Sequence, residues 1–277
     1  MKNITVFVAG VTVIAWAANY LASVLGAGDP ALASVGMSVA AMGPLVMAIV
    51  LRRRANEGWA NAGLKTRFGQ NKLWYGFSLL YIPVVIGLVA AMALSLEVAE
   101  ITPDPGDAMD AIVLTFSITF GPMLLLSIGE EFGWRGYLEP ALRSVNSRVV
   151  LNHIFIGLVW GFWHFPVLLF APASETDPVQ LLMVVVGCVA LAVIYGQLRW
   201  RSESVWPCVI LHAISNTTFI SVGSSKALLF DDGVKDIISF NTTSVAVVGI
   251  WILTCLWLLS AIRTNPASPV SLGHLSR

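Results

Sequence analysis

The sequence predicts an all-α, polytopic membrane protein with about eight transmembrane helices and with both termini in the cytoplasm. Hydrophobic residues make up 57% of the 277 residues, and charged residues only 12%. Soluble globular domains carry about 25% charged residues, so this composition indicates an integral membrane protein. The hydrophobic residues fall into separate runs of roughly 20 residues, which is the length that a helix needs to cross a bilayer.

The first four hydrophobic runs are separated by short polar or charged loops. A Gly- and Pro-containing turn follows the first run, and the second stops at Arg52, Arg53 and Arg54. An acidic loop that begins at Glu97 and ends at Asp110 separates the third run from the fourth. The four predicted helices cover residues 4–25, 31–51, 73–96 and 111–128.

Of the last four runs, the fifth ends before a Pro- and Ser-containing segment and the seventh ends at about Val222. The sixth run ends at Arg199 and Arg201, and the eighth at Arg263. Residues 1–263 are therefore expected to form a single transmembrane helical domain, and residues 264–277 a disordered tail. The four predicted helices cover residues 149–170, 179–198, 205–222 and 245–262.

Lysines and arginines give the orientation of the predicted helices. With the N-terminus in the cytoplasm and alternating spans, all of the 16 basic residues except Lys226 and Lys235 belong to cytoplasmic segments. The acidic loop then lies on the opposite side. This distribution is the one that the positive-inside rule requires, and it predicts that the C-terminus is also cytoplasmic.

Charge and cysteine content exclude several classes of function. The 16 basic residues balance the 16 acidic ones, so no nucleic-acid partner is expected. Cys188, Cys208 and Cys255 all lie in hydrophobic runs, and an odd number without framework spacing argues against disulfides and a zinc knuckle. The chain shows no internal repeat, which disfavours a transporter built from two related halves.

The fourth run leads into residues 129–136, which read GEEFGWRG. Ionisable groups inside or at the end of a membrane span are costly and therefore mark candidate functional sites. On a helix, Glu131 and Arg135 lie four residues apart and can form an ion pair. Glu130 points about 100° away from that pair, so its carboxylate is available for chemistry. A charge cluster that only marks the membrane edge is the alternative.

Two later runs also carry polar residues at helical spacing. Trp160 and His164 lie one turn apart in the fifth run, and His212 and Asn216 one turn apart in the seventh. A single polar pair of this kind often only joins two helices by a hydrogen bond. A carboxylate, two imidazoles and an amide on three helices are harder to explain in that way, so we expect them to meet in one functional site.

Depth in the membrane supports this convergence. At 1.5 Å per helical residue, Glu130 lies about 20 Å from Arg143, His164 about 24 Å from Arg148, and His212 about 16 Å from Arg201. If these arginines mark the cytoplasmic interface, Glu130, His164 and His212 lie at a similar depth in the membrane. The argument requires the fourth helix to continue past the two glutamates as far as about Pro140.

Three kinds of chemistry fit this set of residues. Glu130 and His164 could deprotonate a water for attack on a carbonyl, while His212 and Asn216 donate hydrogen bonds to the oxyanion. Glu130, His164 and His212 could instead be three ligands of a catalytic zinc ion. Third, Cys208 could act as a nucleophile, although buried cysteines are usually inert.

The three motifs together resemble those of the CPBP family of intramembrane proteases, which includes type II CAAX prenyl endopeptidases and bacteriocin-immunity-like proteins. The resemblance covers about residues 111–222. It implies that Glu130 and His164 act on water, that His212 and Asn216 serve the oxyanion, and that Glu131 and Arg135 form a supporting pair. Trp160 stands where the common pattern has phenylalanine; we expect the aromatic wall, and therefore the chemistry, to be unaffected.

The resemblance implies an intramembrane endopeptidase in the plasma membrane of a prokaryote. Its partners would be the lipid bilayer and a membrane-anchored or lipidated peptide, such as a prenylated CAAX C-terminus, cleaved near the cytoplasmic side. A non-catalytic membrane scaffold or immunity-like protein is the alternative, and a small-solute transporter is a further one. Intact polar residues in all three motifs favour the enzyme.

Members of this family are often called metalloproteases, but the residues favour a metal-free site. Zinc-bound histidines need an acceptor for the second ring nitrogen. The sequence offers few, because Glu131 is engaged by Arg135 and the residues next to His164 are apolar. We therefore predict no tightly bound zinc, with Glu130, His164 and His212 as the ligands if zinc is present.

Overall fold

The computed structural model describes residues 2–26, 29–170 and 177–264. It is 82% helical, which confirms the predicted all-α class. Within these residues, six helices are long and apolar enough to cross a membrane. The seventh and eighth predicted spans are helices too, but they are not among those six, so the count of eight and the location of the termini stay predictions. Residues 265–277, most of the predicted tail, lie outside the described part of the chain.

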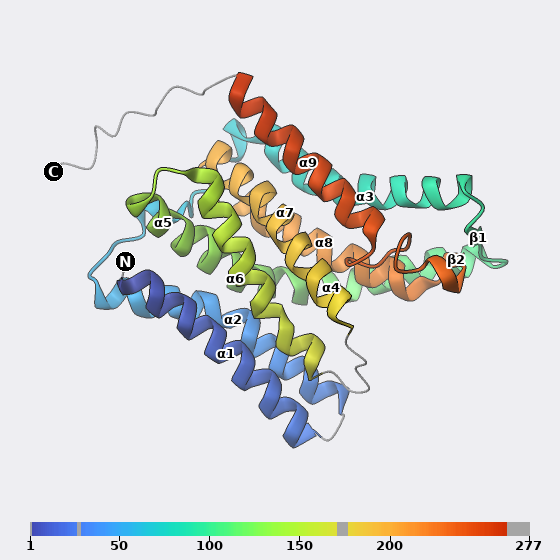
Figure 1. Ribbon diagram of the computed structural model, residues 1–277, viewed down its shortest axis with the longest axis horizontal. Helices are drawn as coiled ribbons and strands as arrows, with labels where there is room; N and C mark the ends of the chain where they lie inside the picture. The colour runs from blue at the N-terminus through green and yellow to red at the C-terminus, as the bar shows by residue number, and fades with distance from the viewer. Residues whose placement is uncertain (1, 27–28, 171–176, 265–277) are drawn as a thin grey trace.

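The N-terminal half begins with two antiparallel helices, α1 (Lys2–Gly26) and α2 (Pro30–Arg54), which pack along each other (Figure 1). The Asp29 side chain accepts a hydrogen bond of 2.8 Å from the Ala31 amide and so caps α2. The connection to α3 (Lys72–Ser95) contains two short 3₁₀ turns, η1 (Ala60–Ala62) and η2 (Phe68–Gln70).

The fourth helical segment carries the two glutamates and is continuous beyond them, as predicted. It consists of α4 (Pro105–Gly133), a π-helical turn η3 (Trp134–Leu138) and α5 (Glu139–Val145). It therefore ends later than the expected limit at Pro140. In η3 the Glu139 amide bonds to the Trp134 carbonyl, five residues back.

Arginines from other segments complete the hydrogen bonding of η3. Pro140 has no amide hydrogen to offer the Gly136 carbonyl, and Arg52 Nη2 donates to that carbonyl instead, at 2.8 Å. Arg199 Nε donates to the Arg135 carbonyl at 3.3 Å. The π-helical turn is therefore held from both sides by buried or half-buried guanidinium groups.

The C-terminal half contains α6 (Val149–Leu169), α7 (Pro178–Ser202), α8 (Trp206–Ser225) and α9 (Val245–Thr264). α6 and α7 approach closely because Gly157 and Gly161 face α7: a Cβ on them would lie 2.5 Å from Val189 Cα and 2.9 Å from Val185 Cα. α4 packs against both α2 and α8. The α4, α6 and α8 segments that carry the predicted site therefore lie within one bundle (Figure 1).

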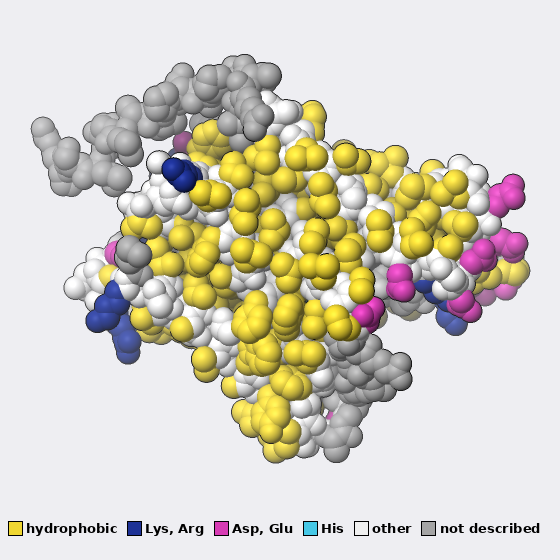
Figure 2. Space-filling model, viewed as in Figure 1, with side chains coloured by type: hydrophobic (Ala, Val, Ile, Leu, Met, Phe, Trp, Pro, Cys, Tyr) yellow, Lys and Arg dark blue, Asp and Glu magenta, His cyan; other side chains and the backbone are white. Residues whose placement is uncertain are grey.

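One end of the molecule carries a small β-structure that the sequence did not predict. β1 (Ala99–Ile101) pairs antiparallel with β2 (Leu228–Phe230), and the 3₁₀ turn η4 (Asp232–Val234) follows. Acidic side chains gather at this end, whereas the visible face of the bundle is mainly hydrophobic (Figure 2). A hydrophobic exterior and a charged end are what a helical bundle in a bilayer requires.

Candidate active site

Glu131, Arg135 and His212 form a buried polar group in the middle of the bundle. The predicted ion pair is present: Arg135 Nη1 donates to Glu131 Oε1 at 3.0 Å, and both side chains are almost completely inaccessible. His212 Nδ1 lies 2.9 Å from the same oxygen and donates to it. One carboxylate oxygen therefore orients both a cation on its own helix and an imidazole on α8.

Two aromatic rings enclose the guanidinium of Arg135. Its Cζ lies 4.8 Å from the centre of the Trp160 ring and 4.6 Å from that of Tyr195. Such contacts stabilise a cation that has left water. Sequence analysis missed Tyr195, because Gln197 and Arg199, which follow it closely, indicate only the end of the apolar run of α7.

Glu130 is also buried, with 5% of its surface exposed, but its partners differ from those of Glu131. Its Oε2 accepts a hydrogen bond of 2.9 Å from the Trp160 indole nitrogen. Its Oε1 lies 3.9 Å from His212 Nε2. The two adjacent glutamates thus face opposite sides of the His212 ring.

His164 is held through its Nδ1 atom, which lies 2.8 Å from the main-chain carbonyl of Trp160. The proton is therefore assigned to Nδ1, and Nε2 carries the free lone pair. Both histidines consequently have an acceptor for Nδ1, Trp160 O for His164 and Glu131 for His212. The expectation that such acceptors would be scarce was wrong: the first comes from the backbone one turn earlier, and the second from a carboxylate that accepts two hydrogen bonds.

A cavity of about 230 Å³ brings the predicted residues of α6 and α8 together. Trp160 and His164 line one wall, and His212 and Asn216 another. Apolar side chains such as Leu191 cover most of the remaining surface. The far rim is polar and is formed by Gln180, at the start of α7, and by Asn241, Thr242 and Thr243, which precede α9.

The sequence of this region matches known proteins. Residues 112–218 match the family described as type II CAAX prenyl endopeptidase Rce1-like. A curated CAAX prenyl protease 2 from Methanococcus maripaludis is 30% identical over 134 residues, which are 46% of this chain and 48% of the relative. The chain thus spans about half the length of the curated relative that it matches.

A metal ion does not fit the residues of this CAAX protease-like site in the arrangement that the structure gives them. Within residues 2–26, 29–170 and 177–264, no three His, Cys, Asp or Glu side chains are grouped so that they could hold a metal ion.

Cys208 does not line the cavity of the CAAX protease-like site. Its thiol donates to the Tyr195 carbonyl at 3.3 Å, and the residue is completely buried. The alternative of a cysteine nucleophile therefore lacks the required geometry. A different cysteine, Cys188, lies with its Sγ 3.8 Å from His164 Nδ1 and lines the cavity.

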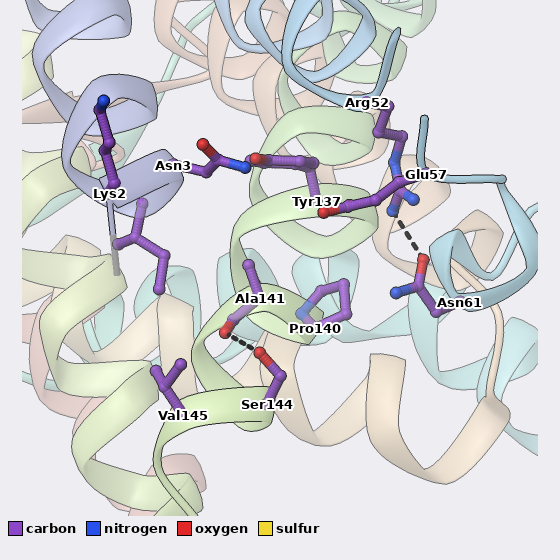
Figure 3. Close-up of a pocket in the computed structure, with 11 residues that line it drawn as sticks. Lys2, Asn3, Arg52, Glu57, Asn61, Tyr137, Pro140, Ala141, Ser144 and Val145 are labelled. Carbon is purple, nitrogen blue, oxygen red and sulfur yellow. Dashed lines mark hydrogen bonds between the residues drawn. The ribbon is translucent and has the colours of Figure 1, made fainter. Parts of the chain in front are cut away.

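A second cavity, of about 400 Å³, lies where the start of α1, the end of α2 and α5 meet (Figure 3). Lys2 and Glu57 contribute charges of opposite sign to it. Arg52 also lines it, but its guanidinium is engaged by the Gly58 carbonyl and the Asn61 side chain. This cavity contains none of the predicted catalytic residues, so we assign the chemistry of the CAAX protease-like domain to the cavity between α6, α7 and α8.

Proposed function

We propose that this protein is an intramembrane endopeptidase that hydrolyses a peptide bond with a water activated by Glu130 and His164. The observation that carries the proposal is the meeting of both histidines and Asn216 at one cavity. Glu130 does not line this cavity, but its Oε1 lies 3.9 Å from Nε2 of His212, which does. A side chain of each catalytic type is thus present: a general base, a second group that orients water, and donors for an oxyanion.

In the proposed reaction, a water donates one hydrogen bond to His164 Nε2 and the other to Glu130. Glu130 takes a proton as the water oxygen attacks the carbonyl carbon of the peptide. The carbonyl oxygen becomes an oxyanion, which Asn216 and His212 stabilise. Collapse of this intermediate breaks the C–N bond, and the proton on Glu130 passes to the leaving amine.

His212 can donate to the oxyanion only in one protonation state. Its Nδ1 already donates to Glu131 at 2.9 Å, so a donor at Nε2 requires a second proton on the ring. Glu130 and Glu131 lie on the two nitrogen sides of this ring. Asn216 needs no such change, because its amide group always offers donors.

The substrate class that we propose is a membrane-anchored or lipidated peptide, including a prenylated CAAX C-terminus. This proposal is supported by the name of the curated relative, a CAAX prenyl protease, and by the hydrophobic bundle. Cleavage near the cytoplasmic side stays a prediction. The polar rim of the cavity is formed by Gln180, near the start of α7, and by Asn241, in the segment before α9. The charge pattern predicts that both lie on the side opposite to the cytoplasm.

The proposal is tested with the purified full-length protein in liposomes. A prenylated CAAX peptide, the same peptide without the lipid, and a hydrophobic helical peptide are each incubated with the wild type and with Glu130→Gln. We expect cleavage of at least one anchored peptide by the wild type and none by the variant. A folded wild type that cleaves none of the peptides, or a fully active variant, would contradict the proposal. The first result would favour the non-catalytic scaffold.

A further inference from the structure

Trp160 makes one contact with the site that a phenylalanine at this position could not make, the hydrogen bond from its indole nitrogen. Its indole N–H donates to Glu130 Oε2 at 2.9 Å, and its carbonyl holds His164 Nδ1 at 2.8 Å. The ring also lies against Arg135. Only 3% of the residue is exposed. The expectation that tryptophan merely preserves an aromatic wall therefore leaves out the polar end of the side chain.

The hydrogen bond from Trp160 makes the two oxygens of Glu130 inequivalent. A buried carboxylate needs hydrogen-bond donors, because it has lost those of water. Trp160 supplies one to Oε2 at 2.9 Å, while Oε1 faces His212 Nε2 at 3.9 Å, which is too long for a direct hydrogen bond. A water near Oε1 could approach both Oε1 and His212 Nε2, whereas Oε2 already accepts one hydrogen bond from Trp160.

We propose that Trp160 is a positioning residue that fixes the carboxylate of Glu130, so that Oε1 is the atom that takes the proton from water. This inference rests on the proposed peptidase function. In the proposed site, the fixed carboxylate plane keeps the base aligned with the attacking water. Misplacement of a reacting group by about 1 Å can cost about 100-fold in rate, so a freely rotating carboxylate would act less often in the right geometry.

The decisive variant is Trp160→Phe, because phenylalanine keeps an aromatic ring beside Arg135 but has no N–H. We expect kcat to fall about 10- to 100-fold, with KM changed by less than about twofold, since a misaligned base affects the chemical step. Trp134→Phe is the matched control: Trp134 is completely buried, its indole nitrogen has no hydrogen-bond partner among the described residues, and its ring contacts Phe7 and Trp163. Its kcat should stay within about threefold of the wild type.

A second measurement does not depend on activity. In protein with ¹⁵N-labelled tryptophan, the indole N–H resonance of Trp160 should move upfield in Glu130→Ala, because its acceptor is gone, while that of Trp134 should not move. An unchanged Trp160 resonance would overturn the proposal. So would a Trp160→Phe variant with wild-type kcat, or one in which only KM rises, since that result would make Trp160 a wall of the substrate cavity.

The two measurements separate the failure of this inference from that of the proposed function. If the wild type cleaves no anchored peptide, the peptidase function fails, and a role for Trp160 in aligning a catalytic base fails with it. The resonance comparison would then still establish whether the indole holds Glu130. If the wild type is active and Trp160→Phe is equally active, only the positioning role is refuted.

Discussion

Replacing Glu131 with glutamine should destabilise the protein far more than the same change at Glu130. The side chain of Glu131 accepts hydrogen bonds from Arg135 and His212 through one oxygen, and neither Glu131 nor Arg135 is accessible to water. Glutamine removes the negative charge and leaves the Arg135 cation buried without compensation. Removing one partner of a buried ion pair costs about 3–5 kcal/mol.

Glu130→Gln provides the matched control, because it is the same change at the next residue. Glu130 pairs with no lysine or arginine among the described residues and lies 3.9 Å from His212 Nε2, and a glutamine oxygen can still accept the bond from Trp160. We therefore expect a loss of less than about 1 kcal/mol in the free energy of unfolding. Turnover should nevertheless fall by at least about 100-fold, since an amide cannot act as a general base.

The assay is thermal unfolding of both variants in the same detergent, followed by tryptophan fluorescence. For chains of this size, 1 kcal/mol corresponds to about 2–4 °C in Tm, so Glu131→Gln should unfold about 6–20 °C below the wild type. Glu130→Gln should unfold within about 4 °C of it. Equal Tm values for the two variants would refute the division of roles between these glutamates.

Three further outcomes are expected. In a cysteine-free background, a cysteine introduced at Lys65 should react with an impermeant reagent from the cytoplasmic side, and one introduced at Asp104 from the outer side. Labelling of position 65 from the outer side would contradict the predicted topology. Arg52→Lys should lower the unfolding free energy by about 2–3 kcal/mol, because an ammonium group cannot bond the Gly58, Asn61 and Gly136 oxygens together; an unchanged Tm would disprove this. Elemental analysis of active protein should find no stoichiometric zinc, and activity should survive a membrane-permeant chelator; loss of activity that zinc restores would make His212 a ligand.

Hydrophobic runs predicted the helices well, because burial in lipid demands long uninterrupted apolar segments. The expected span at residues 149–170 corresponds to α6, Val149–Leu169, and that at 31–51 to α2, Pro30–Arg54. The three-residue strand β1 was missed, since so short a segment has no alternating pattern. The π-helical turn was missed too, because it depends on Arg52, which is distant in sequence.

The spacing of the motifs identified the residues around the cavity, but it did not predict which of their side chains form hydrogen bonds with one another. The ion pair of Glu131 with Arg135 follows from helical geometry alone and is present. The bond between Glu131 and His212, and the one between Trp160 and Glu130, each join different helices. Such contacts follow from how α4, α6 and α8 pack, which no local pattern encodes. The catalytic roles of these residues stay predictions.

The π-helical turn fixes the chain length between the ion pair and α5. In a π-helical turn an amide bonds five residues back, whereas in an α-helix it bonds four residues back. Deleting one residue after Arg135 in η3 would therefore convert it into an ordinary α-helical turn and leave the buried faces of Glu139 and Leu142 nearly unchanged. Inserting one residue would instead rotate both side chains by about 100°. In a library of single-residue changes, residues 136–138 should therefore tolerate deletion better than insertion.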